Sequence, residues 1–240
     1  RENTKLPKYL PPELFSRRLN LASKFDEAFQ QRRQNQQVEA YNQLYVEARR
    51  LMGSEHLKVF DIQEEPKAIR DAYGNNKLGQ ACLLARRLVQ SGARFVEVSD
   101  GGWDMHQDLY NRLDEKAAHL DTALGNLMRD LHSRGLLDET LIVLTTEFGR
   151  KPSLNVNAGR DHHPGAFTSL LIGAGIRGGQ VYGASDKRGF SVEKDHVSIA
   201  EFNTTIAAAA GLPYDQERFA PNGRPFKIGG GSEPIAALLT

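Results

Sequence analysis

A change in hydrophobic pattern at Gly92 limits the folds that this chain can adopt. Up to Gly92, apolar residues recur at the three- and four-residue steps of amphipathic helices, with no strand-like run between them. Beyond it, short apolar runs alternate with a long helical pattern, which is typical of an α/β layered domain. We therefore expect a helical segment over residues 1–92 that packs on an α/β portion over residues 93–240.

Helices make up the first part of the chain in this interpretation. Apolar residues spaced by three and four positions predict helices at 13–33, 38–52 and 77–91. Ser54 is suited to cap a short helix after the second of these, and Gly92 is suited to end the third. We expect the many charges here to lie on solvated faces, and no catalytic motif is evident among them.

The strands belong to the second part. Residues 141–146 read Leu-Ile-Val-Leu-Thr-Thr, a nearly unbroken apolar run of the kind found in strands covered on both faces of a sheet. Ligands of open α/β sheets bind outside the carboxyl ends of strands, so polar residues after such runs are the first candidates for a site. The expected elements are a strand at 94–99, a helix at 109–134 ended by Gly135, strands at 141–146 and 167–172, and a helix at 198–210 capped by Ser198.

The composition excludes several classes of protein. Lys and Arg number 31 against 30 Asp and Glu, and 40% of the residues are hydrophobic, so the chain is neither intrinsically disordered nor collagen-like. No run reaches the roughly 18 apolar residues that a membrane-spanning helix needs. Without a basic stripe, nucleic acid is not an expected partner. The single cysteine, Cys82, lies in an apolar run, and we interpret it as a small buried hydrophobic residue rather than a nucleophile.

Three clusters of acidic, imidazole and guanidinium side chains fall next to the expected strands. Carboxylates and imidazoles together suit a divalent ion such as zinc, manganese or calcium, because they offer both oxygen and nitrogen ligands. Arg150 and Arg160 offer guanidinium groups to a phosphate or sulfate ester. The potential metal ligands are Asp104, His106, Glu147, Asp161, His162 and His163.

Each of these residues also has a simpler interpretation. Asp104 and His106 are typical turn and cap residues, and Glu147 suits a loop or an ion pair with a nearby arginine. His162 and His163 are neighbours, and neighbours in extended backbone point to opposite sides, so we expect one of them to have a structural role. The occurrence of all three clusters in one α/β unit is what favours a metal or ester site.

Several ordered motifs carry a resemblance to a known family. The most specific are residues 102–106 (GWDMH), 146–150 (TEFGR), 159–164 (GRDHHP) and 178–184 (GGQVYGA), with further matches at 40–45 and 76–88. From about Glu39 onward the chain resembles the C-terminal portion of a bacterial family called domain of unknown function 1501. That family is described as sulfatase-like and is placed in the alkaline phosphatase superfamily.

The resemblance implies a fold and a location. It implies an alkaline-phosphatase-like three-layer sandwich with a mostly parallel central sheet, on which the helical first part packs. Further strands of that sheet are expected upstream of the portion that matches. Family members carry a twin-arginine export signal, so the resemblance also implies a protein exported to the periplasm or beyond.

The resemblance also implies roles for single residues. Asp104 resembles the superfamily's central aspartate ligand, His106 a histidine ligand that follows it, and His162 the last histidine ligand. Glu147 resembles an aspartate that a histidine usually follows, and here Phe148 stands in the place of that histidine. One ligand of a two-metal centre is therefore missing from the pattern, and no nucleophile is identifiable.

Our leading hypothesis is an exported metal-dependent hydrolase of small sulfate or phosphate esters. The metal would act as a Lewis acid, and Arg150 or Arg160 would stabilise charge that develops on the ester oxygens. The alternative is a non-catalytic binding or surface-associated protein that uses the same polar residues as a hydrogen-bonded network. A third option is a structural metal site in a larger assembly, which closed coordination by protein ligands would distinguish.

Overall fold

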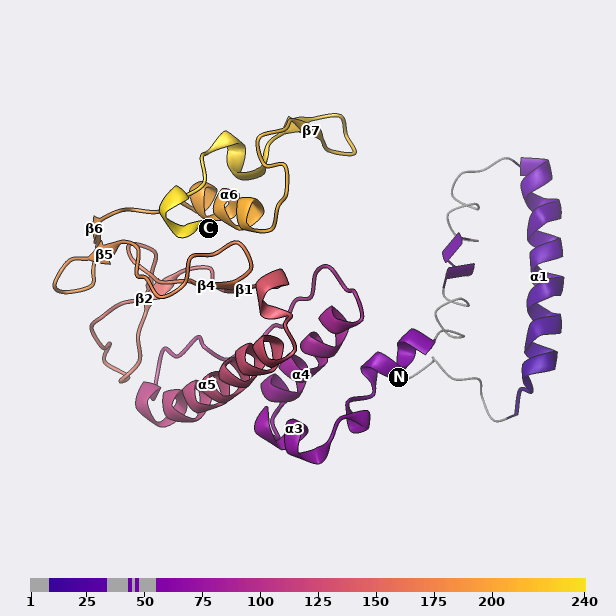
Figure 1. The fold of residues 1–240 in the computed structure, drawn as a ribbon, viewed down its shortest axis with the longest axis horizontal. Coiled ribbons are helices and arrows are strands. Elements are labelled where there is room, and N and C mark those ends of the chain that lie inside the picture. Colours follow the sequence, from indigo (N-terminus) through magenta and orange to yellow (C-terminus); the bar gives the residue numbers. More distant parts are fainter. Residues whose placement is uncertain (1–8, 34–42, 45, 48–54) are drawn as a thin grey trace. The chain divides into compact units, whose positions relative to one another are not determined.

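The computed structural model of the chain describes residues 9–33, 43–44, 46–47 and 55–240 (Figure 1). The chain divides into two compact units, Arg1–Glu65 and Pro66–Thr240.

The first unit contains one long helix among its described residues. Helix α1 spans Pro12–Arg33, which confirms the helix predicted at 13–33, and it carries Glu13 in its first turn, where a negative charge is favoured. Two 3₁₀ turns follow, η1 at Glu55–Phe60 and η2 at Ile62–Glu64. The helix predicted at 38–52 lies largely outside the described residues, as does the cap predicted at Ser54.

The second unit is built around four helices. These are α3 at Lys67–Ala72, α4 at Lys77–Gln90, α5 at Leu109–Ser133 and α6 at Ile199–Ala209. The last three confirm the helices predicted at 77–91, 109–134 and 198–210. Local chemistry explains their ends: Ser198 forms a capping box with Glu201 at the start of α6, and Gly135 follows α5 with φ 68°.

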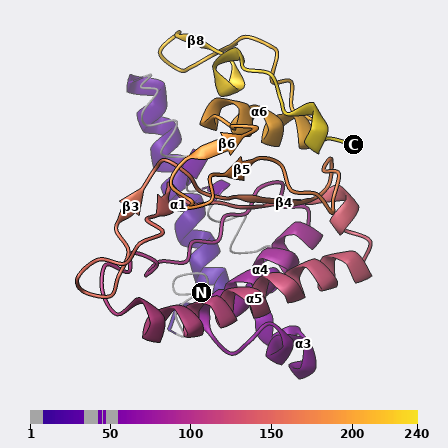
Figure 2. The same ribbon diagram turned by 90° about the vertical axis from the view of Figure 1, so that its left-hand side faces the viewer.

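Helices α4 and α5 pack side by side, as both ribbon views show (Figures 1 and 2). Each helix turns an apolar stripe toward the other, and burial of these stripes forms much of the core. Cys82 is a buried member of this core, as predicted, and burial raises the pKa of its thiol to about 11. The buried apolar residues are Leu78, Cys82, Leu83 and Ala85 from α4, and Leu109, Ala123 and Leu131 from α5.

A charged group is buried within the same helical layer. Arg86 of α4 is 1% exposed, and its Nε lies 2.9 Å from Oδ2 of Asp130 on α5. The Tyr73 hydroxyl donates to the same oxygen at 3.0 Å, and Arg134 Nε lies 2.6 Å from Oδ1. The Asp130 carboxylate therefore ties together α4, α5 and the end of α3.

The β-structure differs from the expected sheet. In the described residues it consists of four separate two-stranded antiparallel sheets. Strand β1 (Leu141–Leu144) pairs with β4 (Leu170–Gly173), β2 (Gly149–Arg150) with β3 (His162–His163), β5 (Ala184–Ser185) with β6 (Val192–Lys194), and β7 (Arg218–Phe219) with β8 (Pro225–Phe226). The prediction of a three-layer sandwich with a mostly parallel central sheet is therefore wrong.

Two features explain this difference. A parallel neighbour requires a crossover connection, usually a helix, but residues 145–169 between β1 and β4 contain no helix, so the chain returns antiparallel. Residues 94–99, predicted as a strand, form no ladder in the described structure. The strands at 141–146 and 167–172 are present in shorter form, as β1 and β4.

Short 3₁₀ turns complete the second unit: η3 at Leu137–Glu139, η4 at Ile228–Gly231 and η5 at Ala236–Leu238. Helix α6 packs against η4. Among the described helices, none combines the length and apolar character needed to cross a membrane.

Candidate functional site

The turn that precedes α5 carries two of the candidate ligands. Asp104 and His106 flank Met105, which is buried and whose carbonyl accepts a hydrogen bond from the Arg160 backbone at 3.0 Å. The Met105 N–H also donates to the Trp103 carbonyl at 2.9 Å, which forms a three-residue turn centred on Asp104, and Asp104 Oδ1 lies 3.0 Å from His106 Nε2. Anchoring of Met105 thus directs Asp104 and His106 toward one place.

Lys116 of α5 holds the start of this turn. Its Nζ donates to the Gly101 carbonyl at 2.7 Å and lies 3.1 Å from Asp100 Oδ2. The same carboxylate oxygen accepts from Trp103 Nε1 at 2.8 Å, and Nζ lies 5.1 Å from the centre of the Trp103 ring. These contacts fasten residues 100–103 to the helix, immediately before the first candidate ligand.

The short β2–β3 ladder brings in the second histidine of the site, His162. Its register pairs Arg150 with His162 and Gly149 with His163. The neighbouring histidines point to different partners: His162 faces Asp104, whereas His163 Nε2 lies 2.7 Å from the Phe190 carbonyl oxygen. Strand geometry therefore assigns His162 to the cluster and His163 to the packing of the loop around residue 190.

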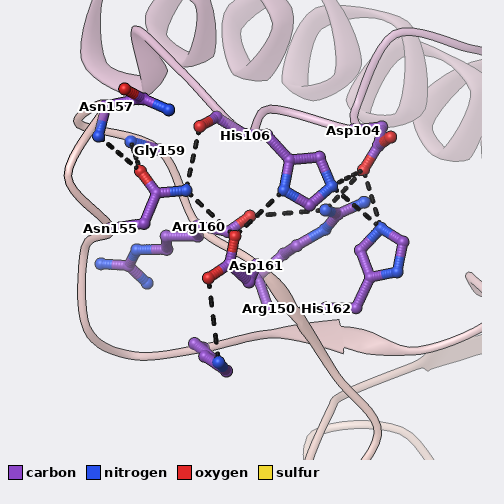
Figure 3. Close-up of polar contacts among 10 residues, drawn as sticks. Asp104, His106, Arg150, Asn155, Asn157, Gly159, Arg160, Asp161 and His162 are labelled. Carbon is purple, nitrogen blue, oxygen red and sulfur yellow. Dashed lines mark hydrogen bonds and ion pairs between the residues drawn. The ribbon is translucent and has the colours of Figure 1, made fainter.

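Three potential ligand atoms converge at this place (Figure 3). Asp104 Oδ1 lies 3.0 Å from His106 Nε2 and 3.0 Å from His162 Nε2, and the two nitrogens are 3.2 Å apart. Their side chains are 63%, 45% and 48% exposed, in the order Asp104, His106 and His162. The cluster therefore lies open to solvent on one side.

Asp161 orients one of these ligands from behind. Its Oδ1 lies 3.1 Å from His106 Nδ1, and hydrogen bonds from Asn155 and from His106 lower the pKa of the Asp161 carboxyl. His106 Nδ1 is therefore placed to donate its hydrogen to Asp161 Oδ1, because an ionised carboxylate only accepts hydrogen bonds. In a neutral His106 this leaves a lone pair on Nε2, directed at Asp104 and His162.

Arg150 and Phe148 complete the surroundings of the cluster. Arg150 Nη1 lies 2.6 Å from Asp104 Oδ1, and hydrogen bonds from His162 and then from Arg150 lower the pKa of Asp104 to about 2. The Phe148 ring lies 4.5 Å from the His162 ring, centre to centre, and 5.9 Å from the Arg150 guanidinium carbon. Asp104 is thus ionised at neutral pH, and Phe148 supports His162 through packing.

Besides His163, two predicted site residues lie apart from this cluster. Glu147 is exposed and, among the described residues, does not belong to the group whose ligand atoms could share an ion. The Arg160 guanidinium points away from Asp104 in Figure 3, and its buried Nε has no hydrogen-bond partner among the described residues. Arg150 is therefore the arginine that contacts the candidate ligands.

Sequence reasoning missed Asn155. Its amide nitrogen donates to the His106 carbonyl and to Asp161 Oδ1, each at 3.0 Å. In the sequence it is one polar residue of the loop at 153–158, where asparagine is common for turn reasons alone. No local signal distinguishes it from Asn157, and only the fold reveals its contacts.

An apolar groove elsewhere in the second unit shares no residue with the cluster. It runs between α4 and the extended residues 96–99, and its polar members are Glu97 and Ser99, which are hydrogen-bonded to each other at 3.2 Å. It offers no metal-binding group of its own beyond one carboxylate. Its lining residues are Ala81, Leu84, Ala85, Leu88, Val96, Glu97, Val98 and Ser99.

These features define a class of protein: a mixed helical and antiparallel-β domain with an open acid–imidazole cluster beside an arginine. The chain belongs to the family described as protein of unknown function (DUF1501), whose model matches residues 1–239. This confirms the family resemblance. No curated protein and no solved structure matches the chain.

Proposed function

We propose that this chain binds a divalent metal ion between Asp104, His106 and His162 and uses it to hydrolyse small sulfate or phosphate esters. One observation carries the proposal. His106 Nε2 and Asp104 Oδ1 lie 3.0 Å apart, while the other ring nitrogen, Nδ1, faces Asp161 Oδ1 at 3.1 Å. A neutral His106 with its proton on Nδ1 places two acceptor atoms at this distance, and they repel each other unless a positive charge lies between them.

The donor set supports a zinc-like ion over calcium. Two imidazoles and one carboxylate are typical zinc ligands, whereas calcium takes six to eight oxygens. A tetrahedral ion bonded at about 2.0–2.1 Å places its ligand atoms ~3.3 Å apart, close to the observed separations of 3.0–3.2 Å. Zinc, or manganese with added water ligands, therefore fits the cluster best.

The exposure of the cluster supports a catalytic rather than a structural ion. Three protein ligands leave a fourth position, and catalytic zinc sites keep such a position open, whereas structural sites are closed by four. A metal bound there supplies Lewis acidity to an ester oxygen. Arg150, 26% exposed at its side chain, offers the remaining N–H groups of its guanidinium to an anionic substrate.

The sulfatase-like character and the export of the protein remain proposals that rest on the family resemblance. Secretion can be examined directly by locating the protein, expressed from its own gene, in fractionated cells. Recovery from the cytoplasmic fraction alone would contradict export.

One observation favours the alternative of a non-catalytic binding protein. Arg150 Nη1 already lies 2.6 Å from the oxygen on which both imidazoles converge. If His106 carries a proton on both nitrogens, Asp104 is satisfied by three donors, from His106, His162 and Arg150, and the cluster is a structural network without metal. The two functions therefore differ in whether the cluster takes up an ion.

Metal uptake by the full chain tests the proposal. After treatment with a chelator, the protein is titrated with zinc, manganese and calcium, and bound metal is measured by elemental analysis. We expect one zinc or manganese ion per chain. In His162→Ala, the affinity should fall by more than the roughly 100-fold that loss of an outer hydrogen-bond partner causes.

His163→Ala is the matched control, because its side chain leaves the adjacent position of the same strand toward Phe190. It should bind metal as the wild type does. Equal binding by wild type and His162→Ala, or no uptake of any ion, would contradict the metal site. Metal uptake without hydrolysis of 4-nitrophenyl sulfate or phosphate would support the metal site and contradict the proposed hydrolase activity.

A further inference from the structure

The side-chain amide of Asn155 joins three parts of the chain behind the cluster (Figure 3). Its Nδ2 donates to the His106 carbonyl and to Asp161 Oδ1, each at 3.0 Å. Its Oδ1 accepts from the backbone N–H groups of Asn157 and Gly159, each at 3.0 Å. One side chain thus contacts the turn before α5, its own loop and the carboxylate that orients His106.

These contacts determine which way the amide points. An asparagine amide has two N–H donors and an oxygen with two lone pairs, and here every one of them has a partner. In the opposite orientation, the oxygen would face two acceptors, the His106 carbonyl and Asp161, while the NH₂ group would face two N–H donors. The hydrogen-bond pattern therefore permits a single orientation, with the donors aimed at Asp161 and His106.

The loop that carries Asn155 lies directly against the candidate ligands. Asn155 N–H donates to the Gly159 carbonyl at 2.8 Å, which closes the loop. A Cβ added at Gly159 would lie 2.0 Å from the carbonyl carbon of His106. Because the loop and the turn touch through backbone atoms, a change in the loop reaches His106 without intervening flexible side chains.

We infer that Asn155 is a positioning residue for the metal site. By holding Asp161 Oδ1 against His106 Nδ1, it keeps the proton on that nitrogen and directs the Nε2 lone pair toward Asp104 and His162. Outer hydrogen-bond partners of this kind fix the tautomer and ring orientation of ligating histidines. The effect on metal rests on the function proposed above, whereas the effect on the tautomer does not.

Two measurements on the full chain separate these claims. The ring nitrogen chemical shifts of His106, recorded without metal at a pH where the imidazole is neutral, report its tautomer. The affinity for zinc reports the completed site. We expect the wild type to hold the Nδ1–H form, and Asn155→Ala and Asn155→Asp to lose that preference and to bind zinc roughly 10- to 100-fold more weakly.

Asn157→Ala is the matched control, since Asn157 enters this network through its backbone N–H only. It should keep the tautomer and the affinity of the wild type. Asp161→Asn is a second test that leaves Asn155 intact, and it should also lose the Nδ1–H preference, because it removes the charge that holds the proton there.

The outcomes are distinguishable. Asn155 variants that keep both the wild-type tautomer and the wild-type zinc affinity overturn the inference, as does a wild type in which His106 carries its proton on Nε2. A wild type with the Nδ1–H form that takes up no metal supports the positioning role and overturns the proposed function. A circular dichroism spectrum of each variant identifies any that does not fold, and Asp161→Asn then decides the tautomer.

Discussion

Replacing Asp130 with alanine should destabilise the second unit more than any change at the exposed cluster. Asp130 is 11% exposed, and its carboxylate lies 2.9 Å from Nε of Arg86, which is 1% exposed. Removing one partner of a buried ion pair costs about 3–5 kcal/mol, because the remaining charge stays buried without its counterion. The Tyr73 hydroxyl also loses its acceptor.

This loss is large relative to the stability of a typical domain. The free energy of unfolding of a typical domain is about 5–15 kcal/mol, so the Asp130→Ala variant loses a substantial fraction of it. For a unit of this size, each kcal/mol of lost stability lowers the melting temperature by roughly 2–4 °C. The loss of about 3–5 kcal/mol therefore predicts a melting temperature lower by about 6–20 °C. Urea denaturation followed by circular dichroism measures the free energy of unfolding directly.

Arg134→Ala is the control for this prediction. Arg134 pairs with the same carboxylate from one turn further along α5, but its side chain is 31% exposed, so its loss should cost no more than about 1 kcal/mol. The reasoning is refuted if Asp130→Ala and Arg134→Ala are equally stable. It is supported if replacing Arg86 and Asp130 together by Met and Leu restores stability, since apolar replacements of a buried pair are often neutral.

Two further predictions concern the site and the pH dependence. Gly159→Ala should separate the loop from the turn before α5, because the new Cβ has no room beside His106. We therefore expect weaker zinc binding in the metal titration described above. Gly101→Ala is the control, since no atom lies within 4 Å of the added carbon, and it should bind zinc as the wild type does. Burial, and secondly the charge of Asp130, raise the pKa of the Tyr73 hydroxyl in the folded protein. As the pH rises, the tyrosine therefore loses its proton in the unfolded chain before it does so in the folded one. The free energy of unfolding should fall as the pH rises above about 10. Tyr73→Phe should show a weaker alkaline loss in pH-dependent urea melts, and an equal loss in both proteins would contradict the assignment.

Local patterns predicted the helices because their causes are local. The periodicity of apolar residues, the serine at 198 and the glycines at 92 and 135 lie within a few residues of the ends that they specify, and α4, α5 and α6 form where expected. The short range of helical hydrogen bonds makes such inference possible.

Strand pairing could not be predicted in the same way. The apolar run at 141–146 does form a strand, β1. The strand it pairs with, whether that pairing is parallel or antiparallel, and how many strands the sheet contains depend on residues distant in sequence. The similar run at 94–99 finds no partner in the described structure. A strand is stabilised by its neighbours, so its own sequence leaves its pairing undetermined.

For the candidate site, residue types alone indicated a metal-binding chemistry, and Asp104, His106 and His162 were all among the predicted ligands. The fold decided which candidates meet. The β2–β3 register separates His162 from His163, Glu147 lies outside the group of possible ligands, and Asn155 enters through hydrogen bonds that join the 153–158 loop to the turn before α5. The functional group of a side chain is known from the sequence, but the distances among side chains are determined only by the path of the folded backbone.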